Sequence, residues 1–209
     1  MSKPSIAFNI PNMLSYYRIL VIPAMFGLFY LEKGAPDWAV FAAWMNVFLF
    51  LLAGLSDFLD GKIARATGQT TLLGKFLDSS TDKMLIGATL MALVAFDRLD
   101  GVWIIPAVVI FLREILIAGV REFMALYNVI VPISKMGKWK MTVQMFFIGF
   151  LLAGPYGQML IPYAYEIGKA GFLFAMVITV TSGYDYMRQA WVTIQEIDGK
   201  EKQSTATNM

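Results

Sequence analysis

Long apolar runs, interrupted by a short stretch rich in acids, constrain the fold of this chain more than any other feature. The runs at residues 13–31, 38–55 and 102–127 are each close to the length, about 20 residues, that a helix needs to cross a bilayer. The stretch at residues 55–83 contains Asp57, Asp60, Asp78 and Asp82. Ionised carboxylates in or beside a bilayer are costly and usually functional, so this stretch is the first candidate for an active site.

The composition is that of a membrane protein with one domain. Of the 209 residues, 58% are hydrophobic and 15% are charged, whereas about 25% are charged in an ordinary soluble domain. About six spans of ~20 residues with short loops use nearly the whole chain. We therefore predict an all-α, polytopic membrane bundle of six helices. It forms a single domain at residues 1–194, with residues 1–11 on the membrane surface and residues 195–209 as a polar tail. A disordered tail is the alternative interpretation of residues 1–11.

The hydrophobic pattern also predicts where each span lies. The six expected spans are 13–31, 38–55, 75–96, 102–127, 141–153 and 170–187. Asn12 is a good amino-terminal cap for the first helix. We expect a basic loop at residues 128–140 and a connection rich in Pro, Tyr and Gly at residues 154–169.

The distribution of basic residues predicts the orientation. Lys33, Arg98 and Lys169 fall on the side opposite the termini and Arg113 lies within a span, which leaves thirteen of the seventeen Lys and Arg residues on the terminal side. The positive-inside rule then places both termini and the acid-rich stretch in the cytoplasm, which for a bacterium means a protein of the inner membrane.

Histidine and cysteine are both absent. This excludes imidazole bases, thiol nucleophiles, zinc sites of the Cys/His type and disulfides. Any catalysis must therefore use carboxylates, lysine, arginine, hydroxyl groups or a metal bound by oxygen.

The spacing of the four aspartates predicts that they converge. On an α-helix, Asp57, Asp60, Gly61 and Ala64 share one face, and Gly74, Asp78 and Asp82 share a face of the next helix. A short loop makes the two helices antiparallel neighbours, so their acidic ends meet. Four carboxylates in one poorly hydrated volume need cations, and hard ions such as Mg²⁺ or Mn²⁺ suit them. Two such ions would clamp a diphosphate and orient an in-line attack.

The other polar and small residues of the stretch fit the same interpretation. Gly61 and Ala64 leave room for a nucleotide or a diphosphate, and Arg65 can neutralise a phosphate. Gly74 would let two helices pack closely. Helix packing is the ordinary explanation of each small residue alone, but its combination with the acids favours a functional site.

These residues form a motif with fixed gaps: Asp57-x-x-Asp60-Gly61-x-x-Ala64-Arg65, eight residues, then Gly74-x-x-x-Asp78-x-x-x-Asp82. The motif resembles the full signature of the CDP-alcohol phosphatidyltransferases. The resemblance implies six transmembrane helices, a two-metal site made by the four aspartates and a homodimer. It also implies transfer of a phosphatidyl group from CDP-diacylglycerol to an alcohol, with release of CMP. By the same resemblance Asp82 is the general base.

The motif does not choose the acceptor alcohol, but cations outside it are informative. Arg113, Arg121, Lys135, Lys138 and Lys140 would hold a phosphorylated acceptor by charge-assisted hydrogen bonds. Positive-inside topology and attraction to anionic lipid explain the loop lysines equally well. These two explanations do not account well for Arg113 and Arg121, because both residues lie within an apolar run.

Further stretches resemble the phosphatidylglycerophosphate synthases, the branch of that family whose acceptor is glycerol 3-phosphate. They are Asn9-Ile-Pro11-Asn12-Met-Leu-Ser15-x-x-Arg18, Arg113-Glu114, Arg121-Glu122, Gly137-Lys138-x-Lys140 with Gln144, and Thr181-x-x-x-x-Tyr186. The resemblance implies that Asn12, Ser15 and Arg18 help to bind the CDP diphosphate and that Arg113, Arg121 and Lys138 bind the acceptor phosphate. Two departures are Ser15, where threonine is usual, and Met141, where threonine is common.

The expected function is thus transfer of a phosphatidyl group to the sn-1 hydroxyl of glycerol 3-phosphate. One alternative is the same chemistry with inositol phosphate or serine as the acceptor. A membrane prenyltransferase would predict a longer bundle and a different spacing of acids. A divalent-cation transporter could use the four aspartates as a permeation site, but an arginine beside a cation path is a barrier.

Overall fold

The computed structural model describes residues 10–67, 72–127, 129 and 135–207, and the predicted surface segment at residues 1–11 falls almost wholly outside them. Within the helices, side chains are described except at residues 10–11, 58–67, 72, 75, 135–138 and 197–207. The described part is helical, as predicted, and consists of α1 (Ile10–Gly34), α2 (Ala39–Thr67), α3 (Leu72–Ala95), α4 (Ile104–Leu126), α5 (Lys135–Ala153) and α6 (Ala164–Thr207). Three short 3₁₀ helices connect them, namely η1 (Pro36–Trp38), η2 (Gly101–Trp103) and η3 (Gly154–Met159).

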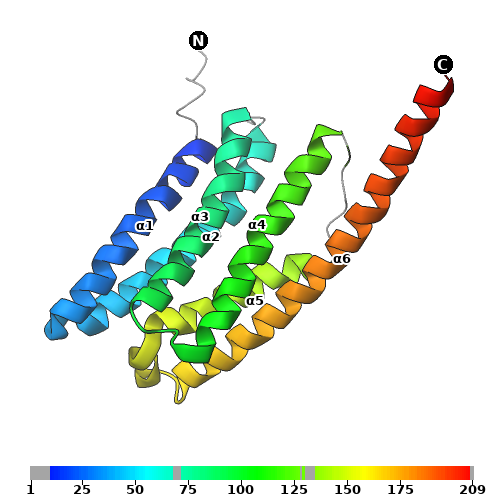
Figure 1. Ribbon diagram of the computed structural model, residues 1–209. Helices are drawn as coiled ribbons and strands as arrows, with labels where there is room; N and C mark the ends of the chain where they lie inside the picture. Colours follow the sequence, from blue (N-terminus) through cyan, green and yellow to red (C-terminus); the bar gives the residue numbers. More distant parts are fainter. Residues whose placement is uncertain (1–9, 68–71, 128, 130–134, 208–209) are drawn as a thin grey trace, which may run out of the picture.

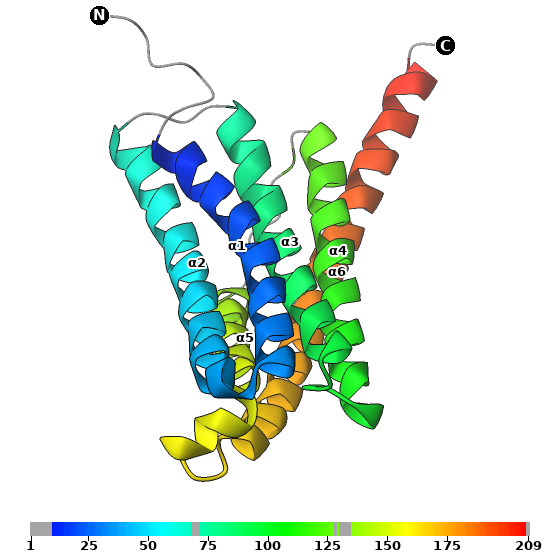
Figure 2. The same cartoon turned by 90° about the vertical axis from the view of Figure 1, so that its left-hand side faces the viewer.

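The six helices form an up-and-down bundle (Figures 1 and 2). Helix α1 packs against both α2 and α3, whereas α6 packs against α4 and α5, and α2 also contacts α5. The start of α1, the end of α2, the start of α3 and the end of α6 all lie at one end of the bundle (Figure 1). The acid motif belongs to that end, which we call the motif end.

The interior is apolar and so is much of the surface. Buried side chains from all six helices form one continuous core that includes Phe29, Phe50, Leu93, Ile110, Ile148 and Phe172. Large apolar side chains are also exposed on the outside of the bundle, among them Leu20, Phe48, Met91, Leu112 and Phe174. A surface of this kind suits contact with lipid tails rather than with water.

Four helical segments of the described chain are long and apolar enough to cross a membrane. They are Asn12–Gly34, Pro36–Asp57, Gly101–Leu126 and Ala164–Glu196. Helices α3 and α5 are not among these segments within the described residues. Asp78, Asp82 and Lys83 lie in the first half of α3, and α5 has only 19 residues.

Several predicted boundaries were wrong. Helix α1 begins at Ile10 with Pro11 in its first turn, so Asn12 lies inside the helix and does not cap it. Proline is well tolerated in a first turn because the N–H that it lacks has no partner there.

The later helices also extend beyond their predicted limits. Helix α5 begins at Lys135, so Lys140 lies on a helix and not in a basic loop. Helix α6 begins at Ala164 and continues to Thr207 over 44 residues, into the segment predicted to be a polar tail. Hydropathy marks where a helix enters the membrane, and a helix can continue beyond that point.

Buried polar and aromatic contacts tie the helices together at the end opposite the motif. The guanidinium of Arg98 forms an ion pair with the carboxylate of Glu32 from α1, and both side chains are largely buried. The hydroxyl of Tyr165 donates to the backbone carbonyl of Arg98 at 2.6 Å. The rings of Phe29 and Phe96 stack with centroids 4.9 Å apart.

Gly154, at the start of η3, is required by this arrangement. Its φ of +53° is unfavourable for residues with a side chain, and a Cβ added there would overlap the Arg98 guanidinium. We expect Gly154→Ala to lower the free energy of unfolding by at least about 1–2 kcal/mol, the cost of the left-handed backbone alone. Thermal or denaturant unfolding of the protein in detergent measures this.

Gly34→Ala is the matched control, because Gly34 has an ordinary φ and a Cβ there meets no atom within 4 Å. Equal stabilities of the two variants would show that neither the left-handed backbone of Gly154 nor its closeness to Arg98 requires a glycine.

Candidate active site

Helix α1 presents a polar face to the interior near the motif end. Asn12, Ser15 and Arg18 recur every three residues and are 0%, 2% and 0% exposed. Residues at this spacing lie on neighbouring turns of one helix face. Three buried polar side chains on one face of a largely apolar segment of α1 indicate that this face lines a site.

Arg18 links the two halves of the acid motif. Its Nη1 lies 2.6 Å from Oδ1 of Asp57 on α2, and its Nη2 lies 3.4 Å from Oδ1 of Asp78 on α3. The Asp57 side chain is 22% exposed and that of Asp78 is 52% exposed, so the site opens on the side of α3. Because a guanidinium stays charged in proteins, its complete burial requires such carboxylate partners.

The position of Arg18 depends on how the first three helices pack. Helices α2 and α3 run in opposite directions, as predicted, but they contact each other only slightly because α1 packs against both. The two acidic helix ends therefore meet through a residue of α1. The sequence motif contains no sign of this contribution.

Asp82 lies one turn beyond Asp78 on α3 and is partly buried. It is close enough to Asp57, Glu114 and Lys140 to interact with them electrostatically. Asp82 thus connects the rest of the acid motif to a second group of charges on α4 and α5.

Part of the predicted site falls outside the described side chains. Asp60, Gly61, Ala64 and Arg65 lie on the last turns of α2, but the structure describes only their backbone. Gly74 lies on α3, one turn before Asp78. Among the side chains that are described, no group of three or more acids lies close enough together to hold a metal ion. Because Asp60 is not among those side chains, the predicted set of four carboxylates stays a prediction.

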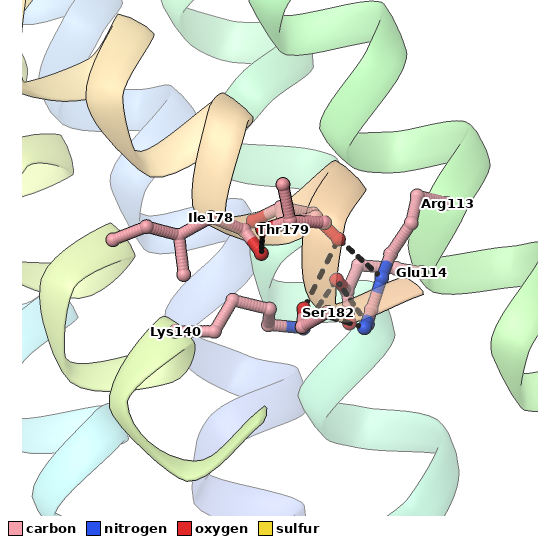
Figure 3. Close-up of polar contacts among 7 residues, drawn as sticks. Arg113, Glu114, Lys140, Ile178, Thr179 and Ser182 are labelled. Carbon is pink, nitrogen blue, oxygen red and sulfur yellow. Dashed lines mark hydrogen bonds and ion pairs between the residues drawn. The ribbon is translucent and has the colours of Figure 1, made fainter. Parts of the chain in front are cut away.

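The second group of charges joins α4, α5 and α6 (Figure 3). Arg113 donates from Nε to the carbonyl oxygen of Thr179 and from Nη2 to Oγ of Ser182, both at 3.0 Å. Its Nη1 lies 3.3 Å from Oε1 of Glu114, and the same oxygen accepts a hydrogen bond from Nζ of Lys140. One carboxylate is thus shared by two cations that come from different helices.

The remaining predicted acceptor residues occupy different environments. Arg121 is exposed two turns beyond Arg113 on α4 and interacts with it electrostatically. Lys138 lies in the first turn of α5, but its side chain is outside the described part. Lys140 is 8% exposed, and Gln144, one turn further along α5, is 3% exposed. Lys140 and Gln144 therefore lie on the interior face of α5.

The sequence interpretation assigned no role to Glu114, Thr179 or Ser182. Glu114 appeared only as the neighbour of Arg113, and the contacts on α6 come from a backbone carbonyl and a small hydroxyl. Ser182 and Gly183 interrupt an apolar helix, which is typical of a position where another group approaches closely. That signal could have indicated α6 as a wall of the site.

Comparison with known proteins identifies the family of this chain. The family model described as CDP-alcohol phosphatidyltransferase matches residues 8–192, which is most of the chain. This chain therefore belongs to the CDP-alcohol phosphatidyltransferase family, and the resemblance drawn from the motif is confirmed.

Three relatives carry the name CDP-diacylglycerol–glycerol-3-phosphate 3-phosphatidyltransferase. The protein of Rickettsia typhi is 37% identical over 180 residues, which cover 86% of this chain and 96% of the relative. That of Escherichia coli K12 is 37% identical over 186 residues, which cover 88% and 95%. That of Haemophilus influenzae is 35% identical over 188 residues, which cover 88% and 94%.

The burial of Arg18 generates a prediction about stability. Arg18→Met removes the cation between two carboxylates, and we expect it to lower the free energy of unfolding by about 1.5–3 kcal/mol in buffer free of divalent ions, the range for hydrogen bonds to charged groups, because both carboxylates keep some contact with water. Denaturant unfolding in detergent measures this.

Lys33→Met is the control, because the ion pair of Lys33 with Asp97 is long, at 3.9 Å, and both side chains are at least 70% exposed. Its cost should stay below about 1 kcal/mol. Similar losses for both variants would contradict the structural role of Arg18.

Proposed function

We propose that this protein transfers the phosphatidyl group of CDP-diacylglycerol to the sn-1 hydroxyl of glycerol 3-phosphate, giving phosphatidylglycerophosphate and CMP. The observation that carries the proposal is the convergence of Asp57 and Asp78, from the two halves of the family motif, on one cation. The choice of acceptor is supported by the shared name of these relatives and by the pair of cations Arg113 and Lys140, of which Lys140 interacts electrostatically with Asp82.

The proposed reaction is an in-line displacement at phosphorus. Asp82 accepts the proton of the sn-1 hydroxyl as the oxygen attacks the phosphorus that carries the diacylglycerol. The bond from that phosphorus to the bridging oxygen breaks, and the oxygen leaves as part of the CMP phosphate. Asn12, Ser15 and Arg18 line the side where the diphosphate would bind, whereas Arg113, Arg121, Lys138 and Lys140 would hold the acceptor phosphate. Gly61, Ala64 and Gly74 would leave space for the nucleotide, and Arg65 would contact the diphosphate.

The donor set fits a hard divalent cation. Asp57 and Asp78 come from different helices yet contact the same guanidinium, so their oxygens are directed toward a common positive charge. We propose that Asp57, Asp60, Asp78 and Asp82 hold two Mg²⁺ or Mn²⁺ ions, which suit carboxylate ligands. Such ions would stabilise the negative charge that develops on the phosphoryl and leaving oxygens.

The arrangement of the helices supports a proposal about the membrane. All six helices would cross the bilayer, α3 and α5 being shielded from lipid in part by the more apolar helices. The excess of basic residues at the motif end favours a cytoplasmic active site in the bacterial inner membrane, with both termini on that side. A homodimer is proposed from the family resemblance.

Release of CMP from CDP-diacylglycerol, measured with each acceptor in turn, tests the function. We expect turnover with glycerol 3-phosphate in Mg²⁺ or Mn²⁺, loss of turnover in EDTA, and little turnover with inositol phosphate or serine. Turnover with one of the latter and not with glycerol 3-phosphate would disprove the choice of acceptor and leave the chemistry intact.

Asp82→Asn tests the general base. The amide keeps the shape of the side chain but cannot take the proton, so we expect kcat to fall by about 10²–10⁴-fold, the range for general acid–base catalysis. Asp97→Asn is the same change at an exposed acid at the opposite end of the bundle, and it should leave kcat unchanged. A kcat near the wild-type value in Asp82→Asn would exclude this role.

A further inference from the structure

Arg113 is held in one orientation by contacts on three of its nitrogen atoms. Nε and Nη2 donate to Thr179 and Ser182 of α6, and Nη1 faces Glu114 on its own helix (Figure 3). Ser182 donates its own proton to the carbonyl of Thr179 at 3.1 Å, so its oxygen is oriented to accept from Arg113. These contacts use three of the five N–H groups of a guanidinium. Among the contacts of the described residues, two N–H groups of Arg113 are left to donate to a ligand.

Glu114 is shared between Arg113 and Lys140 in a place with little access to water. The side chain of Arg113 is 14% exposed, that of Glu114 is 19% exposed and that of Lys140 is 10% exposed. A carboxylate at this depth is costly unless it is paired, and here it has two cationic partners. Together, the side chains of Arg113, Lys140 and Glu114 carry one net positive charge, which suits an anionic ligand.

A glycine on α6 makes room for this arrangement. A Cβ added to Gly183 would lie 2.9 Å from Nε and 3.2 Å from Cγ of Arg113. Both atoms are in the middle of the side chain, so Arg113 would have to move away from α6. The backbone of α6 and the side chain of Arg113 are thus closely matched.

We propose that Glu114 and the segment 179–183 of α6 form a seat that positions Arg113 and Lys140 for the phosphate of the acceptor. This inference rests on the proposed function and adds positioning residues to it. Lys140 and Glu114 lie near Asp82, because both interact with it electrostatically. The seat thereby sets where the acceptor phosphate binds and how the sn-1 hydroxyl reaches the base.

Glu114→Gln distinguishes positioning from simple charge screening. If Glu114 positions the cations, KM for glycerol 3-phosphate rises at least about tenfold and KM for CDP-diacylglycerol changes less than about twofold, since only the acceptor contacts are lost. If Glu114 only screened the cations, its neutralisation would leave a more positive wall and would lower KM for glycerol 3-phosphate. An unchanged or lower KM overturns the proposal.

Gly183→Ala displaces Arg113 without any change of charge, and we expect the same selective rise of KM for glycerol 3-phosphate. Gly119→Ala is the matched control, because Gly119 lies on α4 and a Cβ there meets no atom within 4 Å. Thermal unfolding of each variant shows that it is folded. Equal KM values for Gly183→Ala and Gly119→Ala would overturn the role of α6.

Direct binding of glycerol 3-phosphate to the full-length protein, measured by calorimetry in detergent, separates this proposal from the proposed function. Binding to the wild type without turnover would refute the proposed function, and the seat would then be judged by the ratio of Kd values for Glu114→Gln and wild type. A ratio of at least about ten supports the seat. A ratio near one, or no binding to the wild type, overturns it.

Discussion

The fully buried guanidinium of Arg18 imposes the requirement on which the packing at the motif end depends. A permanent positive charge inside an apolar bundle is tolerated only beside carboxylates, and Asp57 and Asp78 supply them from two other helices. Helix α1 must therefore pack between α2 and α3 at this level. The two halves of the family motif come together as a consequence, at one end of the bundle.

The same rule recurs at two other places in the bundle. Glu114 joins Arg113 of α4 to Lys140 of α5, and Glu32 of α1 pairs with Arg98 beyond α3. Lipid tails are as apolar as the helix surfaces, so apolar contact alone discriminates little among ways of packing helices in a membrane. Buried pairs of opposite charge do discriminate, because any arrangement that separates them leaves an uncompensated ion.

Local pattern predicted some of these features and not others. The fixed spacing of Asp78 and Asp82 placed them correctly on one helix, since helical periodicity is a local property. Hydropathy placed the helix centres well but misplaced Asn12 and Lys140 as a cap and a loop residue. Helix ends outside the apolar zone depend on contacts that hydropathy does not record. Glu114 was overlooked because an acid beside an arginine in a sequence does not reveal a lysine on another helix.

The sequence by itself determined the class of protein and the residues of its motif, because these follow from composition and from spacings of three, four and seven residues within single helices. Only the tertiary structure decided which side chains form ion pairs and hydrogen bonds between helices. Arg18 is separated from Asp57 by 39 residues and from Asp78 by 60, and Arg113 is separated from Ser182 by 69. Contacts at such separations depend on how whole helices pack, and no periodicity within one helix encodes them.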